Sequence, residues 1–144
     1  MDKEGRVIAE GPEFKSFRLP EGFGLGVASA ATQIEGGGVE HSWTDWYRKG
    51  RIKDGSDPAR ANDHYRRWRV DAALMRDLGI RHYRLGLVWA RLEPREGEFD
   101  GEAAAHYREE LLLLREYGIR PLVTLHHFTN PRWFEEKGAF LARE

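Results

Sequence analysis

The chain has 144 residues, of which 40% are hydrophobic and 12% aromatic, and this is enough for one domain with a substantial core. Its 23 basic and 24 acidic side chains nearly cancel, so the charge gives no reason to expect binding to nucleic acid or to an anionic membrane. The absence of cysteine excludes disulfides, thiolate nucleophiles and cysteine-ligated zinc. The first residues are charged and lack the apolar stretch of a signal peptide, so we expect a cytoplasmic protein.

Residues 1–20 contain scattered glycine and proline and no persistent period, and they are predicted to form an arm. Residues 21–144 are predicted to form three parallel strands joined by crossover helices. The first strand is expected over residues 23–31, where small apolar side chains suit a crowded interior. The three glycines that follow Glu35 are expected to end it in a loop.

Two helices are predicted before the second strand. A short helix is expected to begin at Ser42, with Asp45 three residues later as in a capping box. A longer helix is expected to start at Asn62 or Asp63 and to end near residue 78. Its apolar residues recur at spacings of three and four, which is typical of one buried stripe.

The second strand begins the segment 80–94 and is expected to be central. Tyr83 and Leu85 alternate with Arg84, so they should face the opposite side of the sheet. A guanidinium on the inner face of a central strand needs a carboxylate, because an unpaired buried charge is very costly. The neighbouring predicted strands offer no obvious partner.

A second long helix is predicted from a cap at Asp100 to Tyr117, followed by a third strand over residues 120–128 and by a helix that begins near Trp133. Helical crossovers imply parallel strands with right-handed connections. The fold class is therefore α/β, and the order fits the start of a (β/α)₈ barrel or a doubly wound sheet. The glycines after the first strand lack the GxGxxG spacing, which counts against dinucleotide binding.

Ligands of parallel β/α folds bind at the carboxyl ends of the strands. Amide, carboxylate, imidazole, guanidinium and aromatic groups meet there: Gln33, Glu35, Trp89, Arg91, His126, His127 and Phe128. The amide, imidazole and aromatic groups suit a polar, uncharged ligand with many hydroxyls. No HxH or HxxxH spacing is present, so no metal site is expected.

Each of these residues also has a purely structural interpretation. Gln33 could cap the end of a strand, and a lone inward histidine is more often structural than a ligand. The tryptophans could pack in the core or at the rim. Glu35 could be a general acid, or it could bind backbone N–H groups, and Arg84 could belong to a satisfied ion pair in the core.

Four segments together resemble the N-terminal part of the family 1 glycoside hydrolases, the β-glucosidase and β-galactosidase group. They occur in that family's order and at its approximate spacing, and they cover nearly the whole chain. The segments are FRLPEGFGLGVASAATQIEG at 17–36, ANDHY at 61–65, YRLGLVWARLEP at 83–94 and VTLHHFTNP at 123–131.

The resemblance implies a (β/α)₈ barrel that hydrolyses terminal β-D-glycosidic bonds with retention and without a cofactor. Such enzymes use two glutamates about 5 Å apart, one as nucleophile and one as acid/base. Gln33 and His127 match the family's sugar-binding Gln and His, and Phe128 takes the place of a usual Trp. Arg84 matches the arginine beside the nucleophile, which would explain its missing partner.

The chain departs from the family pattern at Leu25 and Thr32, where the family usually has Trp and Tyr. In the family, the two catalytic glutamates end strands four and seven, so we expect neither in this chain. The expectation is then an inactive fragment with three units of a barrel, whose partners are a β-glycoside or oligosaccharide substrate and the remaining strands from a longer chain or a second polypeptide. Two alternatives stay open: a non-catalytic sugar-binding module, and a fragment that completes a barrel by assembly.

Overall fold

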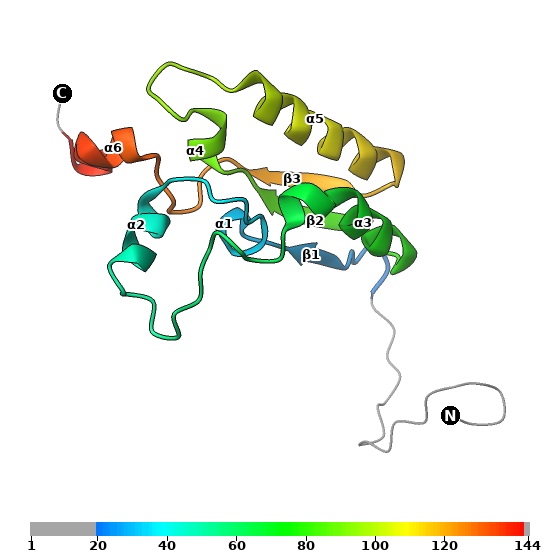
Figure 1. Cartoon of the computed structure of the whole chain (residues 1–144). Helices are drawn as coiled ribbons and strands as arrows, with labels where there is room; N and C mark the ends of the chain where they lie inside the picture. Colours follow the sequence, from blue (N-terminus) through cyan, green and yellow to red (C-terminus); the bar gives the residue numbers. More distant parts are fainter. Residues whose placement is uncertain (1–19, 143–144) are drawn as a thin grey trace.

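The structure, a computed structural model, describes residues 20–142, so the arm predicted over residues 1–20 lies almost wholly outside the described part. Three strands form one parallel sheet in the order β1-β2-β3, as predicted (Figure 1). The strands are β1 (Gly26–Ala28), β2 (His82–Gly86) and β3 (Arg120–Thr124). β1 and β3 are shorter than predicted, because the chain turns into a helix after β1 and into a loop after β3.

Helices follow each strand. Two long ones, α3 (His64–Asp77) and α5 (Gly101–Glu116), are the predicted crossovers. The shorter ones are α1 (Ala31–Ile34), α2 (Ser42–Arg48), α4 (Trp89–Leu92), α6 (Arg132–Glu136) and a 3₁₀ turn at Ala139–Leu141. The sequence patterns did not predict α1 and α4, which are single turns.

The start of α2 corrects one prediction. Ser42 is not the N-cap, because its hydroxyl accepts a hydrogen bond from the backbone N–H of Asn130 instead. The cap is His41, whose Nδ1 accepts from the backbone of Trp43 and Thr44, while the Thr44 hydroxyl closes the capping box. Burial lowers the pKa of His41 to about 4, so the ring is neutral and Nδ1 can accept.

Of the other two predicted helix caps, one is confirmed and the other makes no capping hydrogen bond. Asp100 accepts hydrogen bonds from the backbone N–H groups of Glu102 and Ala103, which confirms it as the cap of α5. Asp63 holds the cap position of α3 but makes no capping hydrogen bond. Its carboxylate pairs with Arg66 instead, at 2.8 Å.

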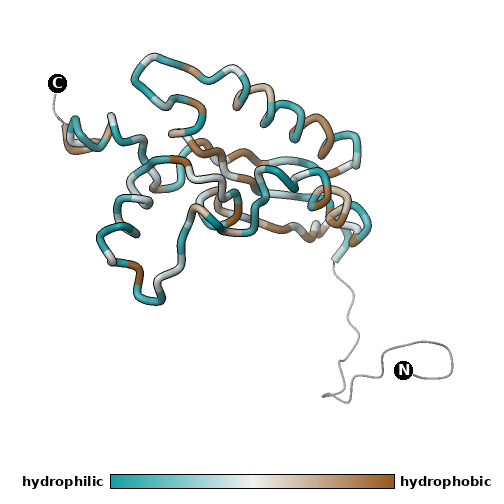
Figure 2. Tube along the Cα trace, viewed as in Figure 1, coloured by the Kyte–Doolittle hydropathy of each residue, from teal (hydrophilic) through white to brown (hydrophobic). Residues whose placement is uncertain are grey.

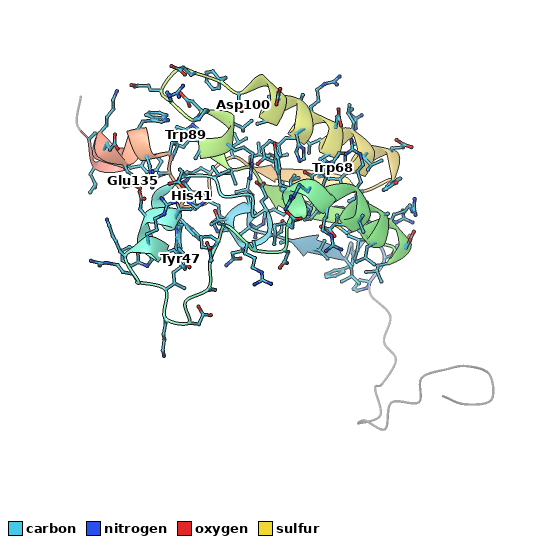
Figure 3. All side chains as sticks on the ribbon, in the orientation of Figure 1. His41, Tyr47, Trp68, Trp89, Asp100 and Glu135 are labelled. Atoms are coloured by element: carbon cyan, nitrogen blue, oxygen red, sulfur yellow. The ribbon has the colours of Figure 1, made fainter. Side chains whose placement is uncertain are left out.

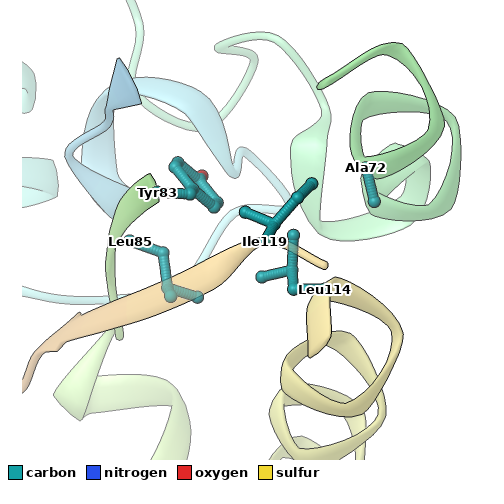
Figure 4. Close-up of a cluster of buried hydrophobic side chains, with 5 residues drawn as sticks. All are labelled: Ala72, Tyr83, Leu85, Leu114 and Ile119. Carbon is teal, nitrogen blue, oxygen red and sulfur yellow. The ribbon is translucent and has the colours of Figure 1, made fainter. Parts of the chain in front are cut away.

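The core lies between the sheet and the two crossover helices. Ala72, Tyr83, Leu85, Leu114 and Ile119 form one buried cluster from α3, β2 and α5 and from the residue before β3 (Figure 4). Figure 2 shows the hydrophobic segments gathered at the sheet, with hydrophilic residues frequent in the surrounding loops. The burial of Tyr83 and Leu85 under the helices confirms the predicted alternation of β2.

The opposite face of the sheet has a different character. Ala28, Arg84 and Leu122 are register partners and form one row across the three strands. Leu122 is 67% exposed and Arg84 is half-buried, so no element among residues 20–142 covers this row. In a complete (β/α)₈ barrel, layers of side chains from eight strands fill this interior. The described residues therefore form an open sheet with an uncovered inner face.

Candidate functional site

A small cavity lies at the carboxyl end of the sheet, between α1 and the loop that follows β3. Its lining includes Gln33, His127 and Phe128, the three predicted substrate-binding residues, together with Trp43 and Leu87. Its volume of about 60 Å³ is far below the ~300 Å³ or more of typical ligand pockets. The cavity that the described residues form is therefore much smaller than a typical ligand pocket.

Gln33 is exposed on α1, a single turn placed directly over the end of β2. The close approach depends on Gly86, because a Cβ at that position would lie 3.2 Å from the backbone nitrogen of Ala31. The sequence predicted a loop at Gln33. The helical turn holds Gln33 at the end of the strand and fixes its backbone in a helical conformation.

His127 and Phe128 lie beyond β3 rather than within it as predicted, because the strand ends at Thr124. Phe128 has a φ of 48°, which is unusual and costly for a bulky residue. Its ring is half-exposed and packs 5.4 Å from Trp43 and 4.6 Å from His127. The half-exposed ring of Phe128 therefore lies beside the imidazole of His127.

The two adjacent histidines have different surroundings. His126 Nε2 lies 2.8 Å from Asn130 Oδ1, and its ring meets Trp89 edge-on (Figure 3 labels Trp89). His127 Nδ1 lies 3.4 Å from Arg84 Nη1. A guanidinium can only donate, so His127 Nδ1 is the acceptor of this long hydrogen bond.

Arg84 forms no ion pair with any of the residues 20–142, and His127 is its one side-chain hydrogen-bond partner there. The interpretation of Arg84 as part of a satisfied ion pair finds no support in this part of the chain. The guanidinium faces the uncovered side of the sheet beside the cavity. It remains available to a carboxylate that approaches from that side.

Two carboxylates near the site are already engaged. Glu35 is buried and binds Tyr107 and Arg91, so neither sequence interpretation, general acid or partner of backbone N–H groups, describes its side chain. Glu93 accepts from the Trp89 indole at 2.7 Å and from the backbone of Gly97 at 2.9 Å. Neither is placed as a free catalytic group.

Sequence reasoning missed Tyr107 as a site-supporting residue. It lies on the apolar stripe of α5, so the pattern indicated a core residue, and only its hydroxyl contacts distinguish it. The Trp89 and Trp133 rings meet edge-on at 5.6 Å, so each ring packs against the other.

Within the described part of the chain, no three His, Asp or Glu side chains are grouped so as to hold a metal ion. None of the helices there combines the length and apolar character needed to cross a membrane.

Comparison with known proteins gives one consistent result. The sequence profile of Glycosyl hydrolase family 1 matches residues 15–144. A rice protein (Oryza sativa subsp. japonica) named probable inactive beta-glucosidase 14 is 36% identical over 136 residues, which are 88% of this chain and 26% of that protein.

Two solved structures superpose closely. The AHE enzyme from Alicyclobacillus herbarius matches with a TM-score of 0.82 and 36% identity over 88% of this chain and 30% of that chain. The beta-glucosidase from Thermotoga maritima, solved with cyclophellitol, matches with a TM-score of 0.79 and 34% identity over 84% of this chain and 29% of that chain. The chain thus spans about 30% of the solved chains that it matches. It belongs to glycosyl hydrolase family 1, and it has the fold of the first three units of that family's (β/α)₈ barrel.

Proposed function

We propose that this chain supplies part of the sugar-binding site of a retaining β-glycosidase of the β-glucosidase type. Gln33 and His127 bind hydroxyls of the terminal sugar, and Phe128 packs against its C–H groups. Arg84 lies beside the nucleophilic carboxylate, which comes from a later strand of the barrel. The remaining strands belong to a longer chain or to a second polypeptide.

One observation carries this proposal. Gln33 and His127 are 94 positions apart in the sequence, yet they line the same cavity with Phe128, and Arg84 reaches His127 from the uncovered inner face. An amide, an imidazole and an aromatic ring then surround a space beside an arginine that has no carboxylate partner among residues 20–142. That is the set of groups a hydroxylated, uncharged ring and a nucleophilic glutamate require.

We further propose that the 144-residue chain is inactive by itself. Retaining hydrolysis needs two carboxyl groups about 5 Å apart that face the sugar. Glu35 and Glu93, which follow α1 and α4 at the carboxyl end of the sheet, are each held by other groups of the protein. The isolated chain should therefore show no turnover of an aryl β-glucoside.

The decisive experiment joins this chain to the remainder of the Thermotoga maritima enzyme, in place of its matched N-terminal part. The hybrid should hydrolyse an aryl β-glucoside. Gln33→Ala and His127→Ala should each lower kcat/KM by about tenfold or more, because each removes hydrogen bonds to the sugar. His126→Ala is the matched control, since the neighbouring imidazole binds Asn130, and it should leave kcat/KM within about threefold.

A folded hybrid in which His126→Ala and His127→Ala behave alike would contradict the proposed sugar contact. Arg84→Met should lower kcat more than it raises KM, because the arginine is proposed to act on the nucleophile. An unchanged kcat would remove Arg84 from the mechanism.

A second candidate function is sugar binding without hydrolysis. The name of the rice relative favours it, because that protein is called probably inactive. In that case, the isolated chain would bind an iminosugar in calorimetry without hydrolysing an aryl β-glucoside, and His127→Ala would abolish that binding. Without saturable binding by the isolated chain, this alternative fails.

A further inference from the structure

Glu35 is the most deeply buried carboxylate near the site. Its side chain is 4% exposed, and both of its oxygens are used. The Tyr107 hydroxyl lies 2.8 Å from Oε1 and 3.0 Å from Oε2, and Arg91 Nε donates to Oε2 at 3.2 Å. Glu35 thus joins the end of α1 to α5 and to α4.

Both partners of Glu35 are themselves anchored. The Tyr107 hydroxyl accepts a hydrogen bond from the backbone N–H of Val88, the residue just before α4, at 3.2 Å. The Arg91 guanidinium donates to the carbonyl of Gly36 at 3.0 Å and lies 3.6 Å from the centre of the Tyr65 ring. These contacts connect the segments that follow β1 and β2 at the carboxyl end of the sheet.

The turn that carries Gln33 depends on such contacts. α1 has four residues and no side-chain cap, and an isolated helix of that length is not stable in water. Besides the Glu35 side chain, two backbone hydrogen bonds hold its end: Asn62 N–H to the carbonyl of Ile34, and Tyr65 N–H to the carbonyl of Glu35. Tertiary anchors therefore determine where Gln33 points.

We infer that Glu35 is a positioning residue, whose carboxylate locks α1 through Tyr107 and Arg91 and thereby holds the Gln33 amide at the cavity that it shares with His127. The role of Gln33 as a sugar ligand rests on the proposed function, but the positioning itself does not. Burial raises the pKa of Glu35, while the Tyr107 and Arg91 contacts oppose that shift. A buried carboxylate is costly unless such partners are present.

The carboxylate chemistry matters more than the side-chain volume. Both partners are hydrogen-bond donors, and a carboxylate can accept from both. In Glu35→Gln, the similarly sized amide keeps one acceptor oxygen and presents its NH₂ group to a donor. The negative charge that pairs with Arg91 is then lost, and the NH₂ group lies among partners that are themselves donors.

The sequence offers a direct readout, because Gln33 is its only glutamine and Asn62 and Asn130 are its only asparagines. Nitrogen-15 NMR of the wild-type chain should therefore show three side-chain amide pairs. The added amide of Glu35→Gln would confuse the spectrum, so Tyr107→Phe and Glu35→Ala are the test variants. In both, the Gln33 amide should shift and narrow toward the random-coil position, while the Asn130 amide stays unchanged.

Glu40→Ala is the matched control, because Glu40 lies in the same segment but is exposed and pairs with Arg48. It should leave the Gln33 amide at its wild-type position. If Glu35→Ala does not fold, Tyr107→Phe still removes the hydroxyl alone. An unmoved Gln33 amide in folded Tyr107→Phe overturns the inference.

Activity of the hybrid enzyme separates this inference from the proposed function. Glu35→Gln should lower kcat/KM by about tenfold, mainly by raising KM. In a hybrid that already carries Gln33→Ala, the same substitution should lower kcat/KM little further. If Gln33→Ala has no effect on kcat/KM although the NMR coupling is present, the sugar contact fails and the positioning stands. Additive effects of the two substitutions would refute action through Gln33.

Discussion

The buried histidine between the two crossover helices should make the stability of this chain depend on pH. His64, the first residue of α3, lies 2.6 Å from Asp71 through Nδ1 and 3.1 Å from Glu110 through Nε2. Its side chain is 8% exposed and that of Glu110 is 3% exposed. With a carboxylate at each ring nitrogen, both nitrogens donate, and the imidazole is held in its charged form.

The magnitude follows from the pKa. Burial lowers the pKa of His64, but the hydrogen bonds to Glu110 and Asp71 outweigh burial and raise it from 6.5 to about 9. The folded state therefore binds this proton more tightly than the unfolded state. The difference corresponds to roughly 3 kcal/mol, fully present below pH 6.5 and lost as the pH rises toward 9.

Urea unfolding followed by circular dichroism at pH 6 and at pH 9.5 measures this loss, and His64→Gln provides the reference for all other titrating groups. The free energy of unfolding should fall by roughly 3 kcal/mol more in the wild type than in His64→Gln over that range. Proton NMR of the ring gives the pKa directly. A His64 that titrates near 6.5 would refute the reasoning, and so would equal pH dependence in both proteins.

Three further substitutions test the fold by urea unfolding. Leu114→Ala removes a side chain with 0% exposure from the core and should cost about 2–5 kcal/mol, whereas a cost below 1 kcal/mol would mean that the core is loosely packed. Asp100→Ala removes the cap of α5 and should lower the free energy of unfolding by about 1 kcal/mol. An unchanged free energy of unfolding would mean that water replaces the cap equally well. Gly36→Ala should destabilise more than Gly38→Ala. Both glycines have positive φ, but only at Gly36 would a Cβ lie 2.6 Å from the carbonyl of Arg60, so equal costs would contradict the described close approach.

The elements that could be predicted from the sequence carry their own signals. α3 and α5 have apolar residues at helical spacing, and Asp100 caps α5 as its position indicated. β2 alternates between buried and exposed faces over its first four residues. Such patterns report on local geometry, because each depends on residues a few positions apart.

The elements that escaped prediction depend on distant residues. α1 and α4 are single turns held by Tyr107 and Arg91, and no local period marks them. The cap of α2 is His41 and not the predicted Ser42, because the Ser42 hydroxyl accepts a hydrogen bond from the backbone N–H of Asn130, 88 positions away. When a side chain has two possible hydrogen-bond partners, the fold determines which of them lies close enough to bind.

The sequence by itself determined the parallel α/β order, the two crossover helices and the candidates Gln33, His127, Phe128 and Arg84. Only the tertiary structure decided that these candidates meet beside one cavity, and that the buried Glu35 carboxylate binds Tyr107 and Arg91. The physical reason is that side-chain type is a local property, whereas a cavity and the partner of a buried charge are made by segments that come together when the chain folds.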